Sequence, residues 1–117
     1  MEQNEQFEIY RGDVVWAYNT TAKGKIQAKG RPYVIVSNNK ANKHSSIITA
    51  IPLTTKHKVS LPTHYTFVMN GKVNTAMAEQ IVCLNKEDIT NIVDTITDYD
   101  LAEIEKRVKI QLDLKGE

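Results

Sequence analysis

The sequence predicts a mainly β fold: a small, strongly bent antiparallel β-barrel closed by one C-terminal helix. Most of the chain consists of short runs rich in Val, Ile, Tyr and Thr, which suit half-buried strands. Connectors rich in Gly, Asn and Lys separate these runs, and a single amphipathic segment follows them. The 117 residues, 41% of them hydrophobic, are enough for one core. We therefore expect one domain over residues 1–117, with residues 1–8 as a flexible N-terminal extension.

Six short strands are expected before the last third of the chain. The Asn70-Gly71 pair between two of them is the strongest short signal for a tight hairpin. Pro52 cannot donate a ladder hydrogen bond, so it predicts an edge or a bulge at the end of its strand. The polar residues 38–45 are expected to form a connector. The strands are expected at residues 10–17, 32–37, 46–53, 63–69, 73–78 and 80–84.

The last third changes from a strand period to a helix period. Asn85 can cap a single helical turn, and residues 91–97 alternate as a short strand does. A helix is expected from Asp98 onward, because acidic residues crowd its first turn and basic residues follow. Apolar residues recur at helical spacing, and the first three of them should pack on the barrel: Leu101, Ile104, Val108 and Leu112.

Composition excludes several classes of protein. The single cysteine, Cys83, cannot form a disulfide within the chain, and one Cys with three His offers few ligands for a structural zinc. The polar, acidic N-terminus does not resemble a signal peptide, and no apolar run approaches the ~20 residues that span a bilayer. We expect a soluble cytoplasmic protein that uses no metal and no cofactor.

Charge is distributed unevenly along the chain, although the net charge is only +1. No Asp or Glu occurs from Val14 to Ala78, a stretch that contains eight lysines and Arg31. Acidic residues outnumber basic ones on both sides of this stretch. Solvated surface lysines would explain the pattern without any ligand. The absence of carboxylates over 65 residues favours instead a surface for a polyanion such as nucleic acid.

The same stretch limits the chemistry that could act on a polyanion. A metal-dependent nuclease needs carboxylates that converge on Mg²⁺, and the histidines at 44, 57 and 64 lack the spacing of a zinc site. RNA needs no metal, because its own 2′-OH can attack the adjacent phosphate while the protein supplies a base, an acid and stabilisation of charge. Arg31 could grip phosphate oxygens, or merely satisfy loop carbonyls. Thr54 and Thr55 offer hydroxyls at a strand end.

Five motifs along about residues 9–114 resemble the MazF/PemK family of toxin endoribonucleases from type II toxin–antitoxin systems. Each motif alone is short, but the family has all five in this order and at this spacing. The motifs are Arg11-Gly12-Asp13-Val14, Gly30-Arg31-Pro32 with the VIVSN that soon follows, the strand end ITAIPLTTK, Leu61-Pro62-Thr63-His64, and Glu79-Gln80-Ile81.

This resemblance implies an SH3-like barrel, shared by MazF, PemK and CcdB toxins, and a homodimer with a groove for single-stranded RNA across its interface. It implies sequence-specific, metal-independent cleavage of mRNA that inhibits translation and growth. The products would carry a 2′,3′-cyclic phosphate (or 3′-phosphate) and a 5′-OH. It also implies a cognate antitoxin whose flexible acidic C-terminal segment occupies the groove, which fits the local positive charge.

The resemblance also gives roles to individual residues. Arg31 matches the family's catalytic arginine and Thr54 its catalytic threonine. Arg31 would stabilise the phosphorane, because a guanidinium with a pKa above ~12 is a poor proton donor. The acceptor of the 2′ proton stays open among His64, His57, Glu79 and water. Residues expected to line the RNA path are Lys23, Lys25, Gln27, Lys29, Thr55, Lys56, His57, Lys58, Leu61, Pro62, His64 and Glu79.

Three departures from the family pattern distinguish this chain from many relatives. Ile26 replaces a loop glutamate, although Gln27 keeps its place, and Met77 and Val82 stand where some relatives have arginine. The absence of these arginines favours a mechanism that uses Arg31 and Thr54. The loop that contains Ile26 would line the RNA path, so its sequence bears on which RNA is cleaved. Two alternatives remain: a CcdB-like toxin of the same fold that binds DNA gyrase without nuclease activity, and a catalytically inactive RNA-binding relative.

Overall fold

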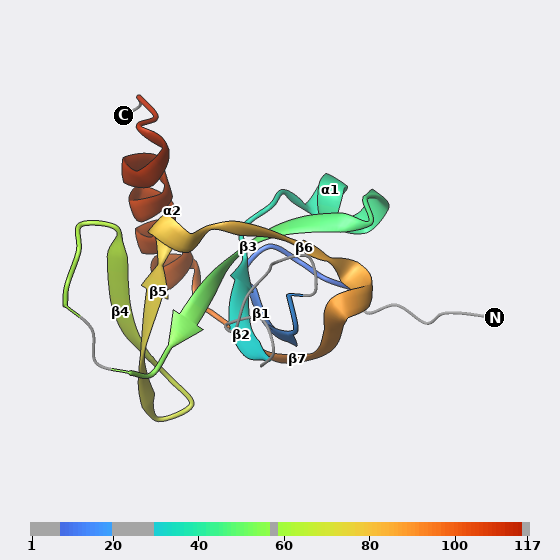
Figure 1. Cartoon of the computed structure of the whole chain (residues 1–117), viewed down its shortest axis with the longest axis horizontal. Helices are drawn as coiled ribbons and strands as arrows, with labels where there is room; N and C mark the ends of the chain where they lie inside the picture. Colours follow the sequence, from blue (N-terminus) through green and yellow to red (C-terminus); the bar gives the residue numbers. More distant parts are fainter. Residues whose placement is uncertain (1–7, 20–29, 57–58, 116–117) are drawn as a thin grey trace.

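The computed structural model describes residues 8–19, 30–56 and 59–115, which form an antiparallel β structure with a C-terminal helix (Figure 1). Within these residues the sheet has seven strands in the order β4-β5-β3-β2-β1-β7, with β6 paired to β3. The predicted fold class, a small antiparallel barrel with a C-terminal helix, is confirmed. The elements are β1 (Asp13–Ala17), β2 (Arg31–Ile35), α1 (Asn39–His44), β3 (Ile47–Thr54), β4 (His64–Met69), β5 (Lys72–Met77), the 3₁₀ turn η2 (Ala78–Gln80), β6 (Val82–Asn85), the 3₁₀ turn η3 (Lys86–Asp88), β7 (Ile89–Thr95) and α2 (Asp98–Leu112).

Strong local signals produced the elements that were predicted. Asn70 and Gly71 have φ angles of 54° and 75° and form the two-residue turn between β4 and β5. Asn85 precedes the single turn η3 as expected, although its side chain makes no capping hydrogen bond. The strand expected at residues 91–97 starts two residues earlier and ends two residues earlier, as β7.

The prediction of a connector at residues 38–45 was wrong, because this segment contains α1. The helix begins after Asn38, whose side chain accepts a hydrogen bond from the Ala41 N–H. Asn42 anchors the helix from a buried position and donates through its amide to Ser37 O at 2.9 Å and to Asn39 Oδ1 at 3.2 Å. A polar network, rather than an apolar stripe, therefore holds α1 in place.

The prediction of an edge or bulge at Pro52 was also wrong, since β3 lies between several partners. One side of β3 pairs with β2, and the other side pairs with β6 over residues 47–50 and with β5 at Leu53 and Thr54. Pro52 lies in the gap between the β6 and β5 ladders, where a missing N–H is tolerated. Strand β3 thereby joins the barrel to the β4–β5 hairpin and carries Thr54 at its end.

The core lies on both faces of the sheet. Along β1, Val15 and Ala17 pack into one cluster with residues of β2, β3, β6 and β7, while Val14 packs into a second cluster with residues of β5 and α2. Strands β2 and β3 alternate in the same way, so they are apolar on both sides. Ile9 also belongs to the first cluster. Most of the extension expected at residues 1–8 lies outside the described residues.

Helix α2 covers the second cluster and lies beside β4 and β5 in Figure 1. Thr97 caps the helix by accepting from the Asp100 N–H. Leu101, Ile104 and Val108 pack against the sheet as predicted, whereas Leu112 is half exposed. No helix within the described ranges is long and apolar enough to cross a membrane.

Three contacts fasten α2 to β4. The Tyr65 hydroxyl donates to Asp100 Oδ1 at 2.7 Å, and burial followed by this hydrogen bond raises the pKa of Tyr65 to about 12. The Arg107 guanidinium lies 5.0 Å from the centre of the Tyr65 ring and donates through Nε to His64 O at 3.3 Å. The helix is therefore held on the face of the hairpin that contains Tyr65.

Candidate functional site

Arg31 and Thr54 lie at the ends of neighbouring antiparallel strands. The β2–β3 ladder pairs Tyr33 with Pro52. Extending this register by two residues brings Arg31, the first residue of β2, opposite Thr54, the last residue of β3. Residues that face each other in this way have Cβ atoms about 5 Å apart. The two predicted catalytic residues therefore share one face of the sheet at one end of the barrel.

The surroundings of Arg31 differ from those of the other two arginines. Arg11 forms an ion pair with Glu105 and donates through Nε to Val36 O at 3.2 Å. Arg107 donates to Glu103 Oε1 at 2.7 Å. Arg31 has no hydrogen bond or ion pair with any residue of the described part of the chain. A half-buried guanidinium without a carboxylate partner is available for an anion.

The Thr54 hydroxyl is held by one hydrogen bond that it accepts, and its own O–H remains available to donate another. Its Oγ1 accepts the Lys56 N–H at 3.1 Å, which leaves the O–H to donate elsewhere. Thr54 pairs with Thr75 of β5, and Thr75 pairs with Thr66 of β4. The hydroxyl oxygens of Thr66 and Thr75 are 3.0 Å apart. A row of three threonines thus runs from the position of Arg31 across the hairpin.

Thr66 and Thr75 are absent from the predicted site, although the sequence contains a signal for their position. The tight turn at Asn70-Gly71 fixes the hairpin register, and this register puts Thr66 opposite Thr75. Leu53, which precedes Thr54, and Ala76, which follows Thr75, belong to the core cluster under α2. Because side chains alternate along a strand, the threonine row faces away from α2.

His64 and Glu79 form a pair at the base of the hairpin. His64 Nε2 lies 2.9 Å from Glu79 Oε2, and the Thr63 hydroxyl donates to Glu79 Oε1 at 2.7 Å. Burial alone would raise the pKa of Glu79, but the hydrogen bonds from Thr63 and His64 lower it below its ordinary value. Only 6% of the His64 side chain is exposed. The pair joins the end of the Leu61–Thr63 turn to η2.

This pair lies apart from Arg31. His64 is on β4 and Arg31 on β2, so three strand intervals separate them. Three intervals correspond to about 14 Å along the sheet. Within one chain, the described structure therefore does not bring His64 and Glu79 to the phosphate that Arg31 would hold.

Replacing Glu79 with glutamine should lower the melting temperature at pH 7 by about 4 °C, equivalent to about 1 kcal/mol for one charged hydrogen bond. The folded pKa of Glu79 lies below 4.5, so its carboxylate stabilises the fold above pH 4.5 and loses this effect as the pH falls through the folded pKa. The difference between wild type and variant should therefore shrink in acid. Circular dichroism melts from pH 3 to 7 measure it, and a difference that does not change with pH would contradict the role of the charge.

The remaining candidate residues divide into exposed ones and ones outside the described structure. Thr55 and Lys56 follow β3 and are exposed, as are Leu61 and Pro62 in the turn before β4. Leu61 is 43% exposed, so an apolar surface is available beside the hairpin. Lys23, Lys25, Gln27, Lys29, His57 and Lys58 lie outside the described residues.

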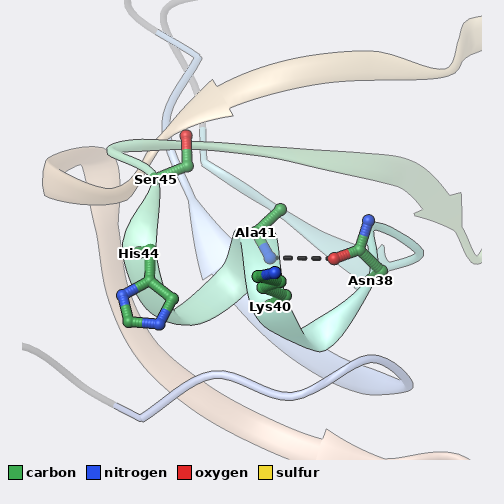
Figure 2. A pocket seen from close by; sticks show the side chains of 5 residues that line it. All are labelled: Asn38, Lys40, Ala41, His44 and Ser45. Carbon is green, nitrogen blue, oxygen red and sulfur yellow. Dashed lines mark hydrogen bonds between the residues drawn. The ribbon is translucent and has the colours of Figure 1, made fainter.

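The other features of the described surface add no group to this site. No cluster of three or more His, Cys, Asp or Glu side chains within the described ranges could hold a metal ion. Figure 2 shows a pocket of about 440 Å³ around α1, lined by Asn38, Lys40, Ala41, His44 and Ser45. Because α1 follows the end of β2 while Arg31 begins that strand, this pocket lies at the opposite end of the sheet.

Comparison with solved structures finds the same fold in known toxins. An endoribonuclease from a mycobacterial species, solved in complex with its cognate antitoxin, is 23% identical and has a TM-score of 0.78 over 93% of this chain and 99% of its own. MazF from Deinococcus radiodurans is 21% identical, with a TM-score of 0.79 over 92% of this chain and 99% of its own. A MazE–MazF complex from the same organism gives 20% identity and a TM-score of 0.75 over 93% and 99%. These similarities establish the fold.

A family model provides the sequence evidence. The model for the PemK-like, MazF-like toxin of type II toxin–antitoxin systems matches residues 10–112. This range starts before β1 and ends at the last residue of α2. The range includes Arg31, Thr54 and the whole β4–β5 hairpin, and it covers nearly all of the chain. The chain therefore belongs to the family of PemK-like, MazF-like toxins of type II toxin–antitoxin systems.

Proposed function

We propose that this toxin is an endoribonuclease that cleaves single-stranded RNA without a metal ion and thereby inhibits translation and growth. One observation carries the proposal: Arg31, alone among the three arginines, has no carboxylate or other hydrogen-bonding partner in the described residues and faces Thr54. Family membership supports it, as do structural relatives described as endoribonucleases.

The reaction requires three events at one phosphate. The 2′ oxygen attacks phosphorus as its proton leaves to a base, the bond from phosphorus to the 5′ oxygen breaks, and the 5′ oxygen takes up a proton. The products are a 2′,3′-cyclic phosphate, which water can open to a 3′-phosphate, and a 5′-OH. Arg31 would stabilise the charge on the phosphorane with two parallel N–H groups, and Thr54 would donate its free O–H to a phosphate oxygen.

The base that takes the 2′ proton is expected to be water or His57. His64 and Glu79 bind each other and lie three strand intervals from Arg31. We therefore give this pair a positioning role: it holds the turn that presents Leu61 and Pro62 to the RNA. Lys56 and the other candidate lysines would contact phosphates along the strand.

The same surface supports the proposed partners. Val68 and Val73 pair across the hairpin on the face of the threonine row and are 67% and 59% exposed. Such an apolar pair fits the interface of a homodimer with the RNA groove beside it. The acid-free stretch from Val14 to Ala78 suits the acidic C-terminal segment of a cognate antitoxin. Because mRNA would be the substrate, we place the protein in the cytoplasm.

Digestion of a long single-stranded RNA in EDTA tests this function. We expect cleavage at a short preferred sequence, with 5′-OH ends and cyclic phosphates when the ends are mapped. Binding to an uncleavable RNA should weaken steeply between 50 and 200 mM salt, by about 10³-fold if six or more phosphates are contacted. Intact RNA in the presence of folded, antitoxin-free protein would refute the nuclease, and inhibition of gyrase under the same conditions would support the CcdB-like alternative.

A further inference from the structure

Tyr33 lies directly behind the candidate site. It is two residues after Arg31 on β2, so both side chains leave the same face of the strand. Its ring belongs to the core cluster inside the barrel, and the residue is 5% exposed. In the register, Tyr33 lies between Val15 of β1 and Pro52 of β3. It therefore fills the end of the barrel beneath Arg31 and Thr54.

The Tyr33 hydroxyl has no partner within the described residues. No hydrogen bond to it is formed by any side chain or backbone group of this part of the chain. A buried tyrosine usually finds a partner for its hydroxyl, because burial removes the hydrogen bonds that water would supply. Phenylalanine would fill the same space without this loss. The hydroxyl thus adds nothing to the packing that surrounds it.

The charge of Arg31 acts on this hydroxyl. Burial raises the pKa of Tyr33, and the nearby Arg31 lowers it by a smaller amount, so the pKa remains above its ordinary value of 10.0. Two consequences follow. The phenol is close enough to Arg31 to interact with it, and at neutral pH it keeps its proton and is a hydrogen-bond donor.

We propose that the Tyr33 hydroxyl is a further substrate-contacting group, which donates a hydrogen bond to a non-bridging oxygen of the phosphate held by Arg31. The inference rests on the proposed nuclease function and extends it to a third donor besides Arg31 and Thr54. No proton is transferred: the hydroxyl keeps its hydrogen, and the bond strengthens as negative charge accumulates on the phosphorane. A donor fixed in a barrel end needs no reorganisation during the reaction.

Tyr33→Phe tests the proposal, because it removes the hydroxyl and keeps the ring. With an oligoribonucleotide that contains the mapped cleavage site, kcat should fall about 10- to 100-fold with little change in KM. The melting temperature should stay the same or rise, because the hydroxyl has no partner to lose. A lower melting temperature with an unchanged kcat would overturn the proposal in favour of a structural hydroxyl.

Tyr65→Phe is the matched control. The Tyr65 hydroxyl does have a partner, Asp100, and it lies on the α2 side of the sheet. This variant should lose thermal stability and keep the wild-type kcat. The two variants therefore make opposite predictions for the same chemical change.

A second measurement separates failure of this proposal from failure of the nuclease function. The protein is labelled with 3-fluorotyrosine and observed by fluorine NMR. The resonance that is missing from the spectrum of the Tyr33→Phe variant belongs to Tyr33. It should shift when a 2′-O-methyl oligoribonucleotide, which cannot be cleaved, is added. If wild type cleaves RNA but Tyr33→Phe cleaves equally fast and the resonance does not shift, the Tyr33 proposal alone is wrong. If wild type does not cleave RNA, the nuclease function is wrong, and an unshifted resonance then refutes the phosphate contact as well.

Discussion

Arg31→Ala is expected to reduce RNA cleavage by about 10³-fold, equivalent to about 4 kcal/mol, while the protein stays folded. The extended β2–β3 register places this guanidinium opposite Thr54, so its removal takes away the planar cation that would hold two oxygens of the phosphorane. Stability should change little, because Arg31 has no hydrogen bond or ion pair with the described residues. Initial cleavage rates and thermal melts measure the two effects.

Arg11→Ala provides the matched control. Arg11 joins the segment before β1 to α2 through Glu105 and to the residue that follows β2 through Val36 O. Its loss should lower the melting temperature by a few degrees and leave kcat within about twofold of wild type, as for other partly exposed ion pairs. Arg31→Lys should recover only part of the lost rate, because an ammonium cannot bind two phosphate oxygens in a fixed plane. Full activity of Arg31→Ala would remove this residue from the mechanism.

Local signals explain which parts of the fold could be predicted from the sequence. Asn70 and Gly71 adopt positive φ values that few other pairs would accept, so the hairpin register is encoded in two residues. The start of α2 is encoded in a similar way by Thr97 and the acidic first turn. Each of these elements depends on residues close together in the sequence. Prediction succeeded where the determinants were local.

The errors arose where distant residues decide the structure. The segment that forms α1 has no apolar period, and its buried Asn42 bonds to Ser37, whose hydroxyl in turn accepts the N–H of Thr49 on β3. Pro52 is compatible with an inner strand because β3 exchanges one partner for another beside it. A single sequence contains no local sign of either arrangement, since both depend on which segments become neighbours after folding.

The candidate site shows the same division between features set by local sequence and features set by distant residues. Arg31 could be selected from the sequence because it is the only arginine in a stretch without carboxylates. The ion pair of Arg11 could not, since Arg11 and Glu105 are 94 residues apart, whereas Glu103 and Arg107 lie one helical turn apart on α2. His64 differs most from the expectation, because this candidate base is a buried side chain that pairs with Glu79. For Tyr33 the sequence predicts only a strand residue, because no local pattern shows that its buried hydroxyl lacks a partner within the described residues.

Gly30→Ala should impair both the fold and the catalyst, because the backbone before Arg31 lies against an aromatic ring. A Cβ at residue 30 would lie 2.3 Å from Trp16 Nε1 and 2.9 Å from Tyr18 Cζ. Trp16 pairs with Pro32 in the β1–β2 ladder, so either the indole ring or the start of β2 must move to make room for the methyl group. We expect a loss of about 1–3 kcal/mol in the free energy of unfolding, measured with urea. Cleavage should fall about 10²-fold, since a shift of 1 Å in a catalytic group has an effect of that size.

A second substitution decides whether the contact with Trp16 is the cause. In the double variant Gly30→Ala with Trp16→Ala, the new methyl group meets no indole, so the loss should be smaller than the sum of the two single losses. Gly71→Ala is the control, because that glycine has a positive φ but a Cβ there would contact nothing within 4 Å. It should cost about 1 kcal/mol through backbone strain and leave cleavage unchanged. Two substitutions that share a contact depart from additivity. If the losses in the free energy of unfolding at residues 16 and 30 were strictly additive, Gly30 would affect Arg31 by a route other than the Trp16 ring.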